Sequence, residues 1–124
     1  MPIDWWDPMR RLQGRSISNG MIEAHVHSSH RLGALVDVRC ETDFVARSPE
    51  FEALARDIAI QVVAMNPTRI SADEPAPPDG DDVPLLQQRF VNDQSRTIQD
   101  LLNAVGGHFQ ERIEIRRFAR FELA

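Results

Sequence analysis

The stretch ALVDVRCETDFVARSPEFEALARDIAI (residues 34–60) changes from a strand pattern to a helix pattern across one short polar turn. Its first part alternates apolar and polar side chains, as expected for a β-strand with one buried face. Its last part repeats apolar side chains every three or four residues, which is typical of an amphipathic helix. The turn between them holds Phe44, although such turns usually contain Gly, Asn, Asp or Ser. The Phe44 side chain could fill the domain's own core, or it could contact another protein.

The helix after this turn carries its own start and stop signals. Ser48 is a good N-cap, Pro49 suits the first helical position, and acidic residues favour the first turn. The dipeptide Asn66-Pro67 ends the segment. The predicted apolar face comprises Phe51, Leu54, Ala55, Ile58, Val62 and Met65.

Upstream, residues 20–40 follow a period of two and predict a β-hairpin with one buried and one mixed face. A two-residue Asn-Gly turn is missing, so we expect a loop of about five residues. The side chains assigned to the buried face are Ile22, Ala24, Val26, Ala34, Val36, Val38 and Cys40.

Downstream, residues 71–84 are rich in proline and aspartate and predict a solvated connector. A second helix begins in TIQDLLNAV, with Thr97 as its cap and Asp100 at the capping-box position. The final run RIEIRRFARFEL starts as an alternating strand. Its pattern slips near Arg117 and Phe118, as a β-bulge would cause.

The predicted order is strand, strand, helix, connector, helix, strand, which describes an α+β domain. We expect a three-stranded antiparallel sheet packed with helices, formed by residues 19–124 with the connector at 71–84. Residues 1–18 are a predicted N-terminal arm that contains the adjacent Trp5 and Trp6. These tryptophans could pack on the domain, or they could form a second contact with a partner.

Composition and charge limit the function classes. The 124 residues suit one domain, and a net charge of -5 argues against direct nucleic-acid binding, which depends on neutralising phosphates. One cysteine, Cys40, fits a reducing compartment; it could join two copies, but a buried thiol is the simpler expectation. No apolar run approaches the ~18 residues of a membrane span, and the start lacks a signal-peptide pattern. We therefore expect a cytoplasmic protein.

The sequence shows no convincing catalytic group. His25, His27 and His30 in HVHSSH suggest a metal site, because alternate residues share one face of a strand. No acid or cysteine accompanies them at ligand spacing, so surface histidines explain the pattern better. Phosphate-binding and nucleophile–base motifs are also missing. We expect no covalent catalysis, no cofactor and no metal.

One motif remains, and it carries a resemblance. The segment LGALVDVRCETDFVARSPEFEALARDIAIQVVAMNP (residues 32–67) closely resembles the core of bacterial and organellar elongation factor Ts. The similarity continues in SNGMIEAHVHSSHRLG, FVNDQSRTIQDLL and IEIRRFARFEL, and spans roughly residues 17–70 and 85–123. Within this setting TDFVAR is a specific motif.

The resemblance implies that the protein binds elongation factor Tu and promotes exchange of its GDP for GTP. In the family, the Asp-Phe of the motif contacts the nucleotide-binding domain, and the phenylalanine intrudes between its helices. The corresponding positions are Asp43 and Phe44, flanked by Thr42 and Val45.

The sequence also departs from the family pattern. MPIDWWDPMRRLQGR stands where members carry a small three-helix domain, and the connector replaces a helical insertion or second core half. We expect a single core half to pair with a second copy through its apolar sheet face, giving a homodimer. SSH stands where the hairpin loop is often glycine-rich, and Gln110 where a helix-ending glycine is usual.

Three functions stay open. The first is nucleotide exchange on elongation factor Tu. The second is a reduced relative that docks on elongation factor Tu or another partner without exchange. The third is an assembly subunit whose Phe44 is buried within its own dimer.

Overall fold

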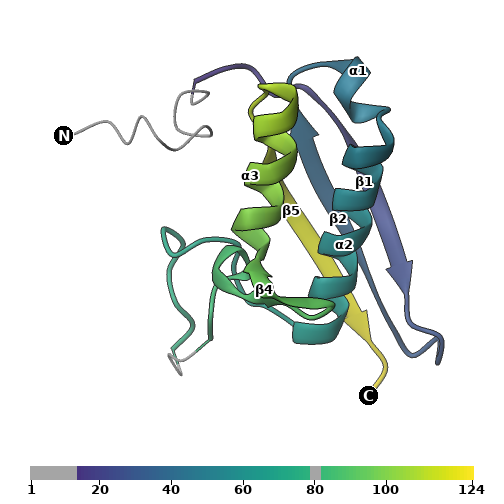
Figure 1. Ribbon diagram of the computed structural model, residues 1–124. Coiled ribbons are helices and arrows are strands. Elements are labelled where there is room, and N and C mark those ends of the chain that lie inside the picture. Colours follow the sequence, from purple (N-terminus) through teal and green to yellow (C-terminus); the bar gives the residue numbers. More distant parts are fainter. Residues whose placement is uncertain (1–13, 79–81) are drawn as a thin grey trace.

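The computed structural model describes residues 14–78 and 82–124. A sheet, two long helices, a short helix and a small hairpin make up the fold (Figure 1). In chain order the elements are β1 (Asn19–Val26), β2 (Leu32–Cys40), α1 (Asp43–Ala46), α2 (Pro49–Met65), η2 (Leu85–Gln87), β3 (Arg89–Phe90), β4 (Asp93–Thr97), α3 (Ile98–Phe109) and β5 (Glu114–Glu122).

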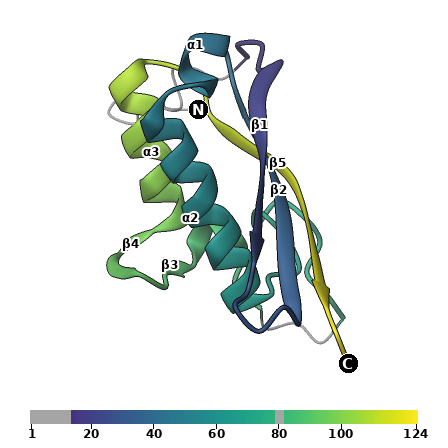
Figure 2. The ribbon, with the colours of Figure 1, turned by 90° about the vertical axis from the view of Figure 1, so that its right-hand side faces the viewer.

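The main sheet has the strand order β1-β2-β5, and both neighbouring pairs are antiparallel. This arrangement confirms the predicted α+β fold with a three-stranded antiparallel sheet. The hairpin loop between β1 and β2 comprises residues 27–31, the length expected from the sequence. Both long helices lie on one face of this sheet (Figure 2).

A β-bulge interrupts β5 close to the predicted position. Asp37 of β2 pairs with Arg117, whereas the next residue, Val38, pairs with Ile115. Arg116 is therefore the extra residue on β5, one to two positions before the slip expected from the sequence. After the bulge the alternate side chains of β5 face opposite sides of the sheet again.

The long helices begin and end as their sequences predict. The hydroxyl of Ser48 accepts a hydrogen bond from the Phe51 N–H at 3.1 Å and caps α2, which ends at Asn66 in the left-handed conformation. Thr97 and Asp100 form the predicted capping box at the start of α3. The end of α3 falls on Gln110, which adopts a φ of 55° where a glycine would be free of strain.

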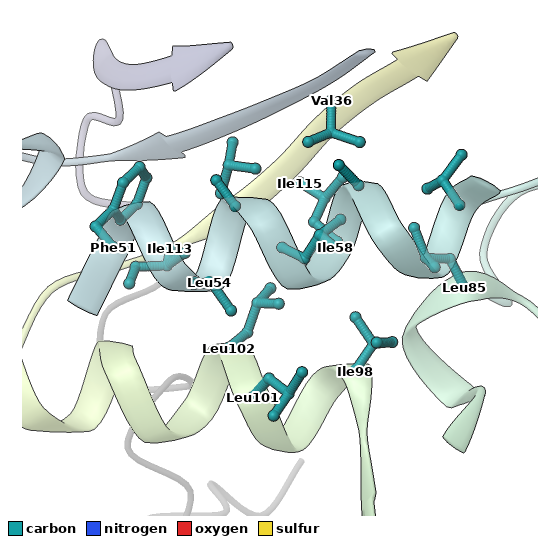
Figure 3. Packing of buried hydrophobic residues seen from close by; sticks show 14 of the residues in the cluster. Val36, Phe51, Leu54, Ile58, Leu85, Ile98, Leu101, Leu102, Ile113 and Ile115 are labelled. Carbon is teal, nitrogen blue, oxygen red and sulfur yellow. The ribbon is translucent and has the colours of Figure 1, made fainter. Parts of the chain in front are cut away.

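The hydrophobic core lies between the inner face of the sheet and the two long helices (Figure 3). Leu54 of α2 and Leu102 of α3 point toward one another there, and Val36 of β2 contributes from the sheet. Each large side chain buried in this way contributes about 1.5–3 kcal/mol relative to exposure. Every residue of the predicted helix face except Met65 is buried: Phe51, Leu54, Ala55, Ile58 and Val62.

The side of β1 predicted to be buried faces away from the helices, so this expectation is wrong. Glu23 pairs with the fully buried Val36, whereas Ala24 pairs with Leu35, which is half exposed. Ile22, Ala24 and Val26 therefore share the open side of the sheet with Leu35 and are exposed, whereas Met21 packs against the core. We call the sheet surface turned away from α2 and α3 the outer face.

Three features were not expected from the sequence: the one-turn helix α1, the short 3₁₀ helix η2, and the hairpin of β3 and β4. The hairpin is tied to α2 by the buried Gln61. Its amide nitrogen donates to Gln88 Oε1 and to the Arg89 carbonyl, and its Oε1 accepts from the Val91 N–H at 2.9 Å. This side chain thus satisfies the backbone of a hairpin too short to stabilise itself.

The remaining predictions concern the ends of the folded region. The described part of residues 71–84 contains no helix or strand. Ile17 is buried, so the last residues of the predicted arm lie against the domain. The division into arm, core and connector stays a prediction.

Candidate functional site

The turn that holds Phe44 is the one-turn helix α1, directly after β2. Its N-cap is Thr42, whose hydroxyl accepts a hydrogen bond from the Val45 N–H at 3.3 Å. Ser48 follows three residues after Val45, and its hydroxyl donates to the Val45 carbonyl at 2.7 Å. Thr42 therefore holds the start of α1 by a hydrogen bond, and Ser48 holds its end. Ser48 also caps α2, so it joins the two helices.

One side of α1 is buried and the other is exposed. Val45 and Ala46 face the core and are 1% and 8% exposed, whereas Phe44 is 77% exposed. Asp43 Oδ2 lies 2.9 Å from Arg47 Nε, and both of these side chains are exposed. A surface ion pair of this kind adds little stability. The exposed side of α1 therefore presents an aromatic ring beside a pair of opposite charges.

All four residues predicted to bind a partner lie on α1 or at its cap. Thr42, Asp43 and Phe44 are exposed, so they are accessible to a partner. Val45 is not, because its side chain is part of the core. Within the motif, the Val45 side chain therefore anchors α1 to the hydrophobic core.

A buried carboxylate that sequence reasoning missed lies at the base of α1. Glu111, in the segment between α3 and β5, is 9% exposed. Its Oε1 accepts hydrogen bonds from the N–H groups of Glu41 and Thr42, both at 3.1 Å, and its Oε2 accepts from the Thr42 hydroxyl at 2.6 Å. A single glutamate about 70 residues away from its partners leaves no local pattern that could have indicated this contact.

Cys40 also belongs to the base of α1. The thiol is free and fully buried, as the sequence predicted, which leaves it no access to a second copy. Burial, with a smaller effect of the Glu111 carboxylate, raises the pKa of the Cys40 thiol to about 11. The thiol therefore stays protonated at neutral pH, and its Sγ donates to the Thr42 carbonyl at 3.3 Å.

The other candidate residues lie elsewhere. His27 and His30 are in the exposed hairpin loop, where His27 Nδ1 lies 2.8 Å from the Ser29 hydroxyl and His30 adopts a φ of 59°. Over residues 14–78 and 82–124, no three His, Cys, Asp or Glu side chains gather as metal ligands would. Within the same ranges, no helix is long and apolar enough to span a bilayer. Trp5 and Trp6 lie outside the described residues.

Comparison with known proteins identifies the family. The profile described as Elongation factor TS matches residues 8–76, which include β1, β2, α1 and α2. Elongation factor Ts from Syntrophobacter fumaroxidans is 35% identical over 143 positions, covering 89% of this chain and 72% of the relative. The relatives from Desulforamulus reducens and the Porphyra purpurea chloroplast are 32% and 35% identical, covering 89% of this chain and 66% of their own lengths. The chain belongs to the elongation factor Ts family.

The alignments also show that this chain and its relatives differ in length. They run over 143 to 150 positions, more than the 124 residues of this chain, so the relatives contain internal segments that it lacks. The chain spans about two thirds of the length of two of these relatives.

Proposed function

We propose that this protein binds elongation factor Tu through α1 and promotes the exchange of its GDP for GTP. Family membership supports a role in translation elongation. The observation that carries the proposal is Phe44, a ring 77% exposed on a helix fixed by capping and by a buried underside. An aromatic side chain on a backbone that is already fixed can enter a partner with little further loss of backbone conformational entropy. We place this activity in the cytoplasm, with protein contacts only.

Exchange of this kind needs no covalent step. The factor must bind the nucleotide-free partner more strongly than the loaded one, and linkage then weakens nucleotide binding by the same factor. Burial of the Phe44 ring on the partner supplies about 1.5–3 kcal/mol, a tenfold or larger shift. Bound Mg²⁺ demands strict octahedral geometry, so a small displacement of its surroundings weakens the nucleotide site. Asp43 adds a polar contact beside the ring.

The test is the release of a fluorescent GDP analogue from elongation factor Tu. We expect the wild-type protein to accelerate release and Phe44→Ala to lose most of the acceleration. Phe121→Ala is the matched control, because Phe121 is 74% exposed but lies at the end of β5. Equal loss in both variants would contradict a specific contact through α1.

Docking without exchange is the second candidate function. The match covers 66–72% of the relatives' lengths. Any contact with elongation factor Tu that the relatives make through their remaining residues lies outside the match, which favours this second function. It predicts that Phe44→Ala weakens binding while even the wild-type protein leaves GDP release unchanged. Binding and release are therefore measured on the same samples.

We further propose that the protein forms a homodimer through the outer face. The exposed apolar residues there are Ile22, Val26, Leu35 and Phe121. Two grooves of about 400 and 330 Å³ lie between these residues, so a second copy could interdigitate with the first. Sedimentation over a range of concentrations tests the proposal, and a monomer at all concentrations would overturn it.

A further inference from the structure

Glu111 forms one half of a reciprocal contact between two distant segments. Its carboxylate accepts from the N–H groups of Glu41 and Thr42, while the Glu41 carboxylate accepts from the N–H of Arg112. The segment just after β2 and the segment just before β5 therefore exchange hydrogen bonds from backbone N–H groups to carboxylates. Hydrogen bonds to an ionised acceptor are about twice as strong as neutral ones. We call the contact among these four residues the carboxylate clamp.

The clamp reaches α1 through the Thr42 hydroxyl. This group donates to Glu111 Oε2 at 2.6 Å and accepts from the Val45 N–H at 3.3 Å. A hydroxyl with both roles filled is held in one rotamer, and the same hydroxyl is the cap of α1. The direction of the first turn thus follows from the position of the Glu111 carboxylate.

Burial alone does not set this direction. Val45 and Ala46 keep α1 against the core, and Ser48 holds its C-terminal end through the Val45 carbonyl. Apolar contact is not directional, so the orientation at the N-terminal end of α1 depends on the hydrogen bonds made there. Rotation of α1 would change the direction in which the Phe44 side chain projects, because Phe44 lies only two residues after the cap. Directional hydrogen bonds at the cap fix the backbone there, and with it the direction in which the Phe44 side chain leaves the helix.

We propose that Glu111 is a positioning residue, which fixes the orientation of Phe44 through Thr42 and thereby strengthens the contact with elongation factor Tu. This inference rests on the function proposed above. It assigns a part in partner binding to a residue whose own side chain is only 9% exposed.

The main test is Glu111→Gln, which keeps the size of the side chain but removes its charge and one acceptor oxygen. We expect affinity for elongation factor Tu to fall about tenfold, as for the loss of a charge-assisted hydrogen bond. Asp100→Asn is the matched control, because the Asp100 carboxylate accepts from the Thr97 N–H at 2.9 Å at the other end of α3. It should lower stability without changing affinity. An unchanged affinity for Glu111→Gln would overturn the proposal.

A double-mutant cycle separates positioning from general stability. If Glu111 acts through Phe44, then Glu111→Gln should cost no further affinity once Phe44→Ala is present. Independent losses from the two substitutions would overturn the inference. If Phe44→Ala alone leaves binding unchanged, the proposed function has failed, which is a different result from failure at Glu111 only.

A second pair of variants covers the case in which Glu111→Gln does not fold. Thr42→Val removes the hydroxyl while keeping the side-chain shape, and Thr42→Ser restores the hydroxyl. We expect the valine variant to weaken binding several-fold and the serine variant to recover most of that loss. Equal binding by both would overturn a route through the Thr42 hydroxyl. Hydrogen exchange at the Val45 amide should be faster only in the valine variant.

Discussion

Two phenylalanines are almost equally exposed, Phe44 at 77% and Phe121 at 74%, but their surroundings differ. Phe44 lies on α1, where β2 ends, whereas Phe121 lies near the end of β5 at the opposite end of the sheet (Figure 1). Phe121 shares the outer face with Val26, Leu35 and Leu123, which line one groove with it. Phe44 instead has the charged Asp43 and Arg47 beside it.

The difference shows that exposure alone does not define a kind of site. An apolar side chain among others on a sheet forms a broad surface, which suits a second sheet of the same kind. A single ring beside a charged pair, on a backbone held by caps, suits insertion into a pocket. The predictions below treat the two rings as separable contacts, one for elongation factor Tu and one for a second copy.

The largest expected effect is that of Phe44→Ala on partner binding. Loss of a central aromatic contact costs about 2 kcal/mol or more, so affinity for elongation factor Tu should fall about thirtyfold. Isothermal titration measures this, and sedimentation should show an unchanged dimer. A weaker dimer in this variant would instead support an assembly subunit whose Phe44 contacts its own copy.

Phe121→Ser should have the converse effect. Removal of an exposed ring from the outer face should weaken the dimer about tenfold, since roughly 1.4 kcal/mol of apolar burial is lost. Affinity for elongation factor Tu should stay at the wild-type value. Val83→Ser is a control, because Val83 is also half exposed but lies in the connector. If Phe121→Ser leaves the dimer unchanged, the dimer interface does not lie on the outer face.

Asp37 offers a pH test of the outer face. Its carboxylate, 3% exposed, accepts hydrogen bonds from Arg39 at 2.6 Å and Arg117 at 3.2 Å. The hydrogen bond from Arg39, followed by that from Arg117, lowers the pKa of Asp37 below its ordinary 3.8. The contribution to stability is therefore complete above about pH 4 and is lost as pH falls through the lowered pKa. Asp37→Asn should cost about 1 kcal/mol at pH 7 and flatten this acid dependence in urea unfolding.

The smallest expected effect concerns Gln110, next to Glu111. Gln110 adopts a left-handed φ of 55° at the end of α3, which a glycine adopts without strain. Gln110→Gly should raise the free energy of unfolding by about 0.5–1 kcal/mol, measured by urea unfolding. The affinities for elongation factor Tu and for a second copy should stay unchanged, because the substitution alters neither Phe44 nor Phe121. A loss of elongation factor Tu binding would show that the Gln110 backbone also sets the position of Glu111.

The sequence predicted the long elements well because their signals are local. Ser48 and Thr97 cap helices within three residues of themselves, and both helices begin where predicted. The one-turn helix α1 was missed because four residues cannot show a helical period. The hairpin of β3 and β4 was missed because its main support, Gln61, comes from α2 and leaves no strand pattern.

For the candidate site, the motif TDFVAR was visible in the sequence, but its residue pattern left the exposure of Phe44 open, and only the family resemblance implied an exposed contact. Phe44 and Val45 are adjacent and both apolar, yet the structure exposes the first and buries the second. The direction of α1 decides between them, and this depends on Glu111, which is far away in the chain. The partner and the effect on nucleotide exchange stay predictions.

The amino-acid sequence by itself determined the three long strands and the two long helices, because caps, periodicity and bulges act between near neighbours along the chain. Only the tertiary structure decided which side of β1 is covered. Alternation says that Ile22, Ala24 and Val26 share a side, but strand register and the place of α2 determine which side that is. The same holds for the base of α1, where a carboxylate from a distant segment meets the backbone at Glu41 and Thr42. Such contacts depend on the folded path of the whole chain, so no short window of sequence contains them.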